Sequence, residues 1–132
     1  MTMREILFRG ETGCLWAYGH VRKLGNKIFM YEVDGYPSVV VEPDTVGQYT
    51  GLIDKNGKKI FEGDIIRAVL PETVVCREYV WPLMAVAFSD GVIGVWQSQR
   101  EFTPLQSFAT RVQFEVIGNI HDNPEQMEVR HG

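Results

Sequence analysis

Two carboxylates stand two residues apart at Glu62 and Asp64, with Gly63 between them. Such a pair could hold a metal ion or exchange protons with a substrate. A metal site needs more oxygen ligands than two side chains supply, however, and no third acid lies nearby in the sequence. Aspartate at a turn also accepts local backbone hydrogen bonds. We therefore predict that Glu62 and Asp64 stabilise a bend, either by sharing a face or with Asp64 as its cap.

The histidines and cysteines show no spacing that is typical of zinc ligands or of a catalytic nucleophile; they are His20, His121, His131, Cys14 and Cys76. The sequence contains no Gly-x-Ser-x-Gly elbow, no phosphate-binding loop and no dinucleotide-binding motif. We expect Cys14 to be a small core residue of its strand. The prediction is a protein without catalytic residues, cofactor or metal, and hence not an enzyme.

Aromatic and basic residues alternate at Trp16, Tyr18, His20 and Arg22. In a strand, a period of two places all four on one face, and such a face could stack nucleic-acid bases or contact a protein. The commoner alternative is an amphipathic strand whose aromatic side chains pack on the rest of the fold, and this is the interpretation we favour. The four residues are therefore a candidate interaction surface.

Composition and charge narrow the class of partner. The chain has 132 residues, of which 45% are hydrophobic and 23% charged, with 13 glycines and six prolines. This composition suits one turn-rich β domain, or a small domain with an appendage. The net charge is −4, and residues 61–132 carry ten acids against five arginines and no lysine. The charge therefore disfavours nucleic acid as a partner, and a protein partner is expected.

No apolar run is long enough for a signal peptide or a membrane span. We expect a cytoplasmic protein with reduced thiols and no membrane partner.

Short apolar runs separated by turn residues predict an all-β fold. Asn56-Gly57 and Asp90-Gly91 mark two hairpins, because these residues tolerate positive φ. Before the second turn, Met84, Val86 and Phe88 alternate with small residues, so we expect them to share one face. Residues 74–81 could form an added strand, and residues 97–111 look irregular, with at most one helical turn. A last strand over 112–120 should point Phe114, Val116 and Ile120 one way, with a single helical turn after Asn123. The remaining strands are expected around residues 15–18, 28–33, 39–41, 52–54, 59–61, 65–70, 83–88 and 92–96.

The strand lengths over residues 49–121 suit a small SH3-like β-barrel better than a sandwich. We divide the chain into an N-terminal β segment over 1–43 and a barrel domain over 44–132. The segment carries more apolar surface than so short a piece can bury within itself. We therefore predict that it forms a β subdomain or arm, and that it contributes to a homo-oligomer.

Residues 44–66, with the opening 4–10 and the ending 115–125, closely resemble the YopX family of phage and prophage proteins. The resemblance implies a phage or prophage origin in a bacterial host, a C-terminal SH3-like barrel and self-association in some members. It implies no reaction. The matching signature residues, for which we predict mainly structural roles, are Gly47, Tyr49, Thr50, Gly51, Asp54, Gly57, Glu62, Gly63 and Asp64.

The resulting functional prediction is a phage-encoded accessory protein that acts as a non-enzymatic protein-interaction module. The alternative is a nucleic-acid-binding or ribonuclease-toxin-like barrel, since toxins of that architecture share the turn Gly63-Asp64-Ile65. Such a ribonuclease would need basic residues around a cleft, and Arg67 is the best candidate for one.

Overall fold

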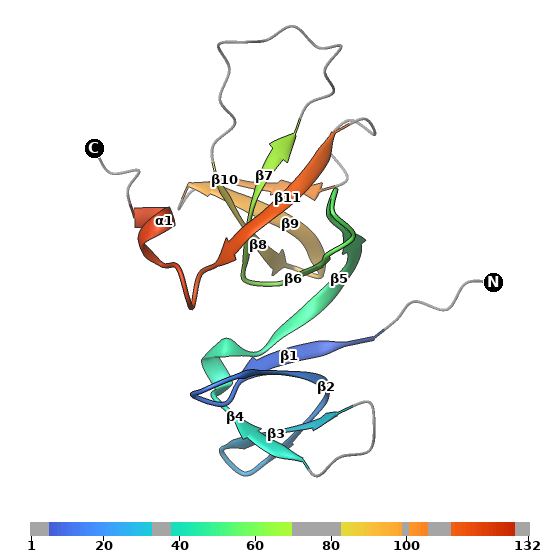
Figure 1. The fold of residues 1–132 in the computed structure, drawn as a ribbon, viewed down its shortest axis with the longest axis vertical. Helices are drawn as coiled ribbons and strands as arrows, with labels where there is room; N and C mark the ends of the chain where they lie inside the picture. The colour runs from blue at the N-terminus through green and yellow to red at the C-terminus, as the bar shows by residue number, and fades with distance from the viewer. Residues whose placement is uncertain (1–5, 33–37, 70–82, 99–100, 106–111, 129–132) are drawn as a thin grey trace, which may run out of the picture. The chain divides into compact units, whose positions relative to one another are not determined.

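The computed structural model describes residues 6–32, 38–69, 83–98, 101–105 and 112–128. They form two antiparallel sheets, in the orders β4-β3-β2-β1-β5-β6 and β10-β9-β8-β7-β11 (Figure 1). The prediction of a mostly-β fold is confirmed. Helical structure includes a 3-10 turn over Pro43–Thr45 and α1 over Glu125–Glu128, so the helical turn expected after Asn123 is also confirmed.

The chain divides into two compact units, Met1–Leu52 and Ile53–Gly132. The sequence-based division placed the boundary between residues 43 and 44. That position lies at the 3-10 turn Pro43–Thr45, and β5 (Gly47–Ile53), whose first residues pair with β1, follows it.

The N-terminal unit is an antiparallel sheet with a small core on one face. The core consists of Ala17, Met30 and Val41, with Phe8 and Val21 among the half-buried residues that pack against it. The strands are β1 (Phe8–Glu11), β2 (Trp16–Leu24), β3 (Lys27–Glu32), β4 (Val39–Val41) and β5 (Gly47–Ile53).

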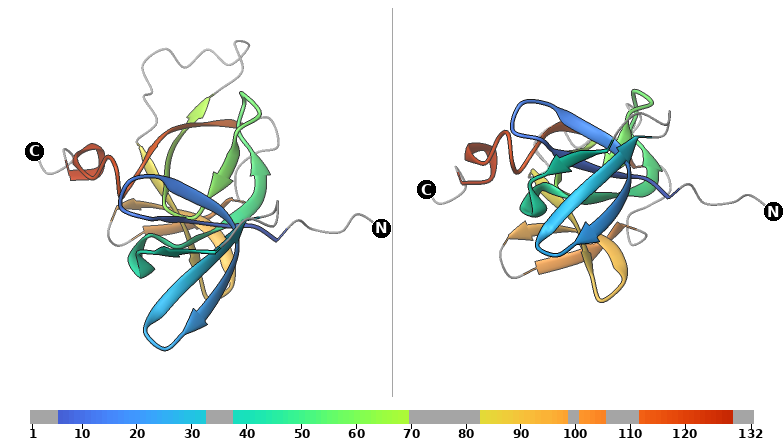
Figure 2. Two further views of the ribbon diagram at one scale, coloured as in Figure 1. Left: turned by 60° about the horizontal axis from the view of Figure 1, so that its bottom comes forward. Right: turned by 90° about the horizontal axis from the view of Figure 1, so that it is seen from below.

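β2 and β3 form a long hairpin around the two-residue turn Gly25–Asn26 (Figure 2). Gly25 has a φ of 65°, as the first central residue of a type II′ turn requires. The turn fixes the register, so that Leu24 lies opposite Lys27 and Arg22 opposite Phe29. A two-residue turn therefore determines which side chains of β3 share a face with those of β2.

The C-terminal unit has a larger core, built from alternating residues of its sheet. Met84 and Val86 are buried on β8 as their spacing predicts, and they pack with Ile60, Ile66 and Val95. The strands are β6 (Lys59–Phe61), β7 (Asp64–Val69), β8 (Met84–Ser89), β9 (Val92–Ser98), β10 (Glu101–Pro104) and β11 (Gln113–Asn119).

The hairpin between β8 and β9 follows its sequence signal closely. Ser89 pairs with Val92, which leaves Asp90 and Gly91 as the two turn residues. Both have positive φ, 52° and 80°, the conformation of a type I′ turn.

Two local predictions are wrong. Residues 97–111 are not simply irregular, because β9 runs to Ser98 and Glu101–Pro104 forms β10 against it. Ile120 does not continue the buried face of β11, since the register shifts between Val116 and Gly118 and leaves Ile120 38% exposed. The possible strand at 74–81 lies outside the described residues.

The second sheet is open in the described part of the chain, with β10 and β11 at its edges. The edge of β11 that faces away from β7 nevertheless has partners. The N–H of Lys55 donates to the carbonyl oxygen of Phe114 at 2.8 Å, and the N–H of Val116 donates to the Asp54 carboxylate at 3.0 Å. The edge is thus covered by the turn that precedes β6, without a further strand.

Candidate functional site

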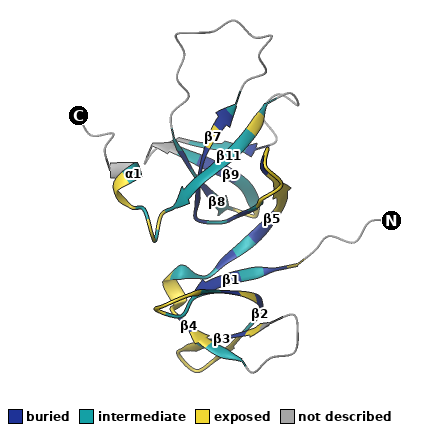
Figure 3. Ribbon diagram, in the orientation of Figure 1, coloured by how far each residue is buried: buried dark blue, intermediate teal, exposed yellow. Residues whose placement is uncertain are grey.

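The predicted interaction residues lie on β2 in the N-terminal unit. Tyr18, His20 and Arg22 are exposed, whereas the intervening Ala17 and Gly19 are buried. Tyr18 keeps 44% of its surface exposed. Figure 3 shows exposed positions recurring along β2 and β3.

Trp16, at the start of β2, is half-buried and differs from the other three. The guanidinium of Arg9 on β1 lies 4.7 Å from the centre of its ring, within the range of a cation–π interaction. Arg9 itself is only 5% exposed. Trp16 and Arg9 therefore contribute to the sheet, and the outward surface of β2 consists of Tyr18, His20 and Arg22.

The register adds two aromatic residues that were not among the predicted interaction residues. Tyr31 lies opposite His20, and Phe29 lies opposite Arg22. Tyr31 is 37% exposed and Phe29 is half-buried. These two pairs could have been predicted from the sequence, because a two-residue turn at Gly25–Asn26 places Tyr31 opposite His20 and Phe29 opposite Arg22.

The charge of this region differs from that of the whole chain. No acidic residue occurs between Glu11 and Glu32, while Arg22, Lys23 and Lys27 fall within that stretch. All three cations are exposed, at or near the turn of the β2–β3 hairpin. The outward surface therefore combines aromatic rings with local positive charge. We call Tyr18, His20, Arg22, Lys27, Phe29 and Tyr31 the hairpin face.

Glu62 and Asp64 differ in burial. Asp64 is 1% exposed, and its carboxylate accepts a 2.7 Å hydrogen bond from the N–H of Phe61, so it caps the bend as predicted. Glu62 is half-buried in that bend. The described ranges contain no cluster of three or more residues able to hold a metal ion.

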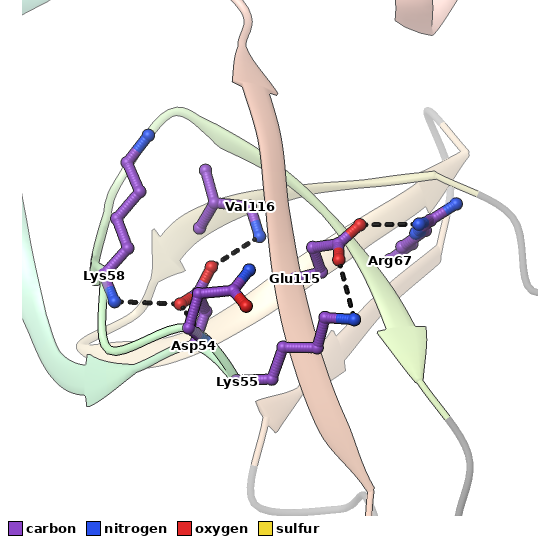
Figure 4. A network of polar contacts seen from close by, with 7 residues as sticks. Asp54, Lys55, Lys58, Arg67, Glu115 and Val116 are labelled. Carbon is purple, nitrogen blue, oxygen red and sulfur yellow. Dashed lines mark hydrogen bonds and ion pairs between the residues drawn. The ribbon is translucent and has the colours of Figure 1, made fainter. Parts of the chain in front are cut away.

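Asp54 is the centre of the polar network in Figure 4. It is 6% exposed, and its carboxylate accepts hydrogen bonds from the N–H groups of Asn56 and Lys58 at 2.8 Å and of Val116 at 3.0 Å. Burial raises the pKa of this carboxyl, but the three donors and the charge of Lys58 outweigh burial and hold the pKa below 3.8. Asp54 thus fastens its own turn to β11.

The turn has a different shape from the one expected. Gly57 has a φ of 83°, but Asn56 does not share the positive φ. The Gly57 N–H donates to the Asp54 carbonyl oxygen at 3.0 Å, and the Asp54 N–H to the Lys58 carbonyl oxygen at 2.7 Å. The Asp54 side chain organises the turn, so that only Gly57 needs the left-handed conformation.

Glu115 on β11 extends the network, and no sequence pattern had singled it out. Its carboxylate lies 3.0 Å from the ammonium of Lys55 and 2.6 Å from the guanidinium of Arg67, which lower its pKa (Figure 4). Arg67, the candidate for a ribonuclease-like cleft, is therefore engaged in an ion pair. Arg67 and Glu115 are 48 residues apart in the sequence, so no local sequence pattern could predict their contact.

The other signature residues have backbone roles or are buried. Gly47 is opposite Arg9 in the sheet, and the Tyr49 N–H donates to the Leu7 carbonyl oxygen at 2.8 Å. Thr50 is 2% exposed, and its hydroxyl accepts a hydrogen bond from the Leu52 N–H at 3.2 Å. Gly51 and Gly63 have φ values of 87° and 92°.

The predictions for cysteine and histidine have separate outcomes. Cys14 is exposed in the turn between β1 and β2, so its assignment to a strand core is wrong. Cys76 and His131 lie outside the described residues. His121 is half-buried, and its backbone N–H donates to the Asn119 side-chain oxygen at 3.0 Å. In the part of the chain that is described, no helix is long and apolar enough to span a membrane.

Comparison with known proteins finds one matching family model and several solved structures that are similar to this chain. The family model described as YopX protein matches residues 9–128. Protein EF1440 from Enterococcus faecalis is 26% identical, with a TM-score of 0.57, over 95% of this chain and 99% of that one. Protein yopX from Bacillus subtilis is 20% identical, with a TM-score of 0.58, over 94% and 98%. No curated protein matches the chain significantly.

Proposed function

The chain belongs to the YopX protein family, and from this premise we propose that it is a non-enzymatic interaction module that self-associates through its N-terminal unit. In this proposal it is an accessory protein of phage or prophage origin that works in the host cytoplasm. Its partners are further copies of itself and a second protein.

The distribution of exposed apolar side chains carries this proposal. Seven of the nine large ones among the described residues belong to the N-terminal unit, which is the shorter of the two. Exposed apolar side chains that gather on one part of a molecule are typical of protein contact surfaces. The seven are Ile6, Leu15, Tyr18, Leu24, Tyr31, Val40 and Leu52; the other two are Ile53 and Ile120.

We further infer that the C-terminal unit is an SH3-like barrel. The hydrogen bonds from the turn at Asp54 and Lys55 to β11 support this, because they bridge an edge that a barrel must close. Such closure uses a turn in place of a continuous strand ladder.

Light scattering over a range of protein concentrations tests the self-association. The full chain is expected to form oligomers whose mass falls on dilution, and the double variant Leu15→Asp/Val40→Asp to remain monomeric. Leu15 is 74% and Val40 48% exposed, so neither change removes a core residue. Ile120→Asp in the C-terminal unit, at a position 38% exposed, is the matched control and should keep the oligomer. A full chain that stays monomeric at high micromolar concentration would contradict the proposal.

A further inference from the structure

We propose that the hairpin face binds single-stranded nucleic acid. This inference goes beyond the proposed self-association. Tyr18 and Tyr31 also count among the exposed apolar side chains of that proposal, but on the hairpin face they occur together with positive charge. Proteins that bind single strands combine positive charge, which follows the phosphate backbone, with aromatic side chains on which the bases stack. Both features occur together on β2 and β3.

The aromatic part of the face is compact. Tyr18 and His20 are two residues apart on β2, a distance of about 7 Å along a strand. Tyr31 lies opposite His20, where cross-strand side chains are about 5 Å apart. Tyr18 and Tyr31 are 44% and 37% exposed, so their rings are accessible from the same side of the sheet.

The positive charge lies beside these rings. Arg22 is next along β2 and opposite Phe29, and Lys27 begins β3 after the turn. Lys23 extends the charge at the tip of the hairpin, and no acid occurs from residue 12 to residue 31. A chain with a net charge of −4 thus carries a stretch of 20 residues with three cations and no acid. Charge complementarity therefore favours an anionic partner on this face.

A second copy of the chain fits the face less well. In a symmetric contact the same patch occurs on both subunits, and the hairpin face contains no acidic residue that could pair with Arg22 or Lys27 of the other copy. An acidic peptide would satisfy the charges, but it offers no flat rings for Tyr18 and Tyr31. A single strand supplies both phosphates and accessible bases, whereas in a duplex the base faces are stacked away.

Fluorescence anisotropy with labelled twelve-nucleotide oligo-dT and oligo-U tests the proposal on the full chain. Binding at low salt is expected for at least one of the two strands. The affinity should fall roughly 20-fold from 50 to 200 mM salt if about three phosphates are neutralised. The double variant Tyr18→Ala/Tyr31→Ala should weaken binding about tenfold or more, given the usual contribution of base stacking. Tyr31→Ala alone should show part of that loss if the double variant folds poorly.

Charge variants and competitors distinguish stacking on the hairpin face from diffuse attraction between charges. Arg22→Glu should weaken binding at least as much as the double variant Tyr18→Ala/Tyr31→Ala does. Arg22→Gln takes its place if the reversed charge disturbs folding. Lys58→Glu, at an exposed lysine of the other hairpin, is the matched control and should change the affinity less than twofold. If Lys58→Glu loses as much affinity as Arg22→Glu, the binding is diffuse attraction between charges. If polyglutamate or a duplex competes as well as an unlabelled single strand, stacking on the face is absent. Either result, or no binding of either strand at low salt, overturns the proposal. A monomeric full chain would contradict the self-association and leave this test unaffected.

Discussion

Two β-hairpins of this molecule carry lysines at their turns and use them in opposite ways. The turn from Asp54 to Lys58 contains a buried carboxylate, and the ammonium of Lys55 pairs with Glu115 on β11. The turn at Gly25–Asn26 is flanked by Lys23 and Lys27, and no acid lies on that hairpin between residues 20 and 31.

The difference shows how one acidic residue changes the role of a turn. Asp54 satisfies two N–H groups of its own turn and one of β11, so this hairpin forms part of the fold of its unit. Among the described residues no buried carboxylate lies at the β2–β3 turn, and the cations of that turn face the solvent. The first hairpin thus stabilises its unit, whereas the second leaves its cations exposed to the solvent.

The largest expected effect comes from removing the carboxylate that defines the first hairpin. Asp54→Ala should lower the free energy of unfolding by about 2–4 kcal/mol, because three backbone N–H groups lose a charged acceptor. Urea denaturation measures it. Asp44→Ala, which removes an exposed carboxylate, is the control and should stay within about 0.5 kcal/mol. If Asp54→Ala and Asp44→Ala lower the free energy of unfolding equally, Asp54 has no special role in the first hairpin and the contrast between the two hairpins fails.

Gly57→Val tests the same turn through its backbone. A β-branched residue forced to a φ of 83° should cost roughly 1–3 kcal/mol of stability. Nothing lies within 4 Å of a Cβ at this position, so the cost comes from the dihedral angle and not from crowding. Thermal melting measures the loss.

Gly25→Val is the matched change in the second hairpin, at a φ of 65° with similar open space. It should destabilise mainly its own turn, because no described side chain fastens that turn to another strand.

For Gly57→Val, a normal melting transition together with loss of a binding partner would contradict a purely structural role and would make the first turn a binding site.

Acid should weaken the first hairpin selectively. The pKa of Asp54 is lower in the folded protein than its ordinary value of 3.8, so folding favours the ionised form. Its contribution to stability is therefore complete above about pH 4 and is lost as the pH falls below that value. Unfolding titrations of the native chain and of Asp54→Asn measure this. The slope of stability against pH below pH 4 should be smaller in the variant, and equal slopes would contradict the assignment.

Local signals predicted much of the fold and less of the candidate site. The β8–β9 turn and the core residues Met84 and Val86 followed from dipeptide preference and a period of two. The register shift in β11 did not, because a bulge depends on the partner strand β7. Cys14 was misplaced since a turn between β1 and β2 lies there, with its backbone bound to the Thr12 hydroxyl.

For the candidate site as well, local sequence patterns predict neighbours along the chain but not contacts between residues distant in sequence. The alternation of residue types along β2 correctly placed Tyr18, His20 and Arg22 on one exposed face, and their role in binding stays a prediction. Their neighbours on β3 required only the turn length, which the sequence also contains. The pairing of Arg67 with Glu115 required the tertiary arrangement of β7 and β11, which no local pattern encodes.

The smallest expected effect belongs to the cations of the second hairpin. Arg22→Ala and Lys27→Ala, singly or together, should change the free energy of unfolding by no more than about 0.5 kcal/mol each, since both side chains are exposed. The same variants should weaken oligonucleotide binding, so stability and binding are expected to separate at these positions. At Asp54 the two should change together, because any loss there follows from unfolding. Urea denaturation and anisotropy on one set of variants compare them directly. A large loss of stability at Arg22 would mean that the second hairpin is also a structural element, and its positive charge would then need no partner to explain it.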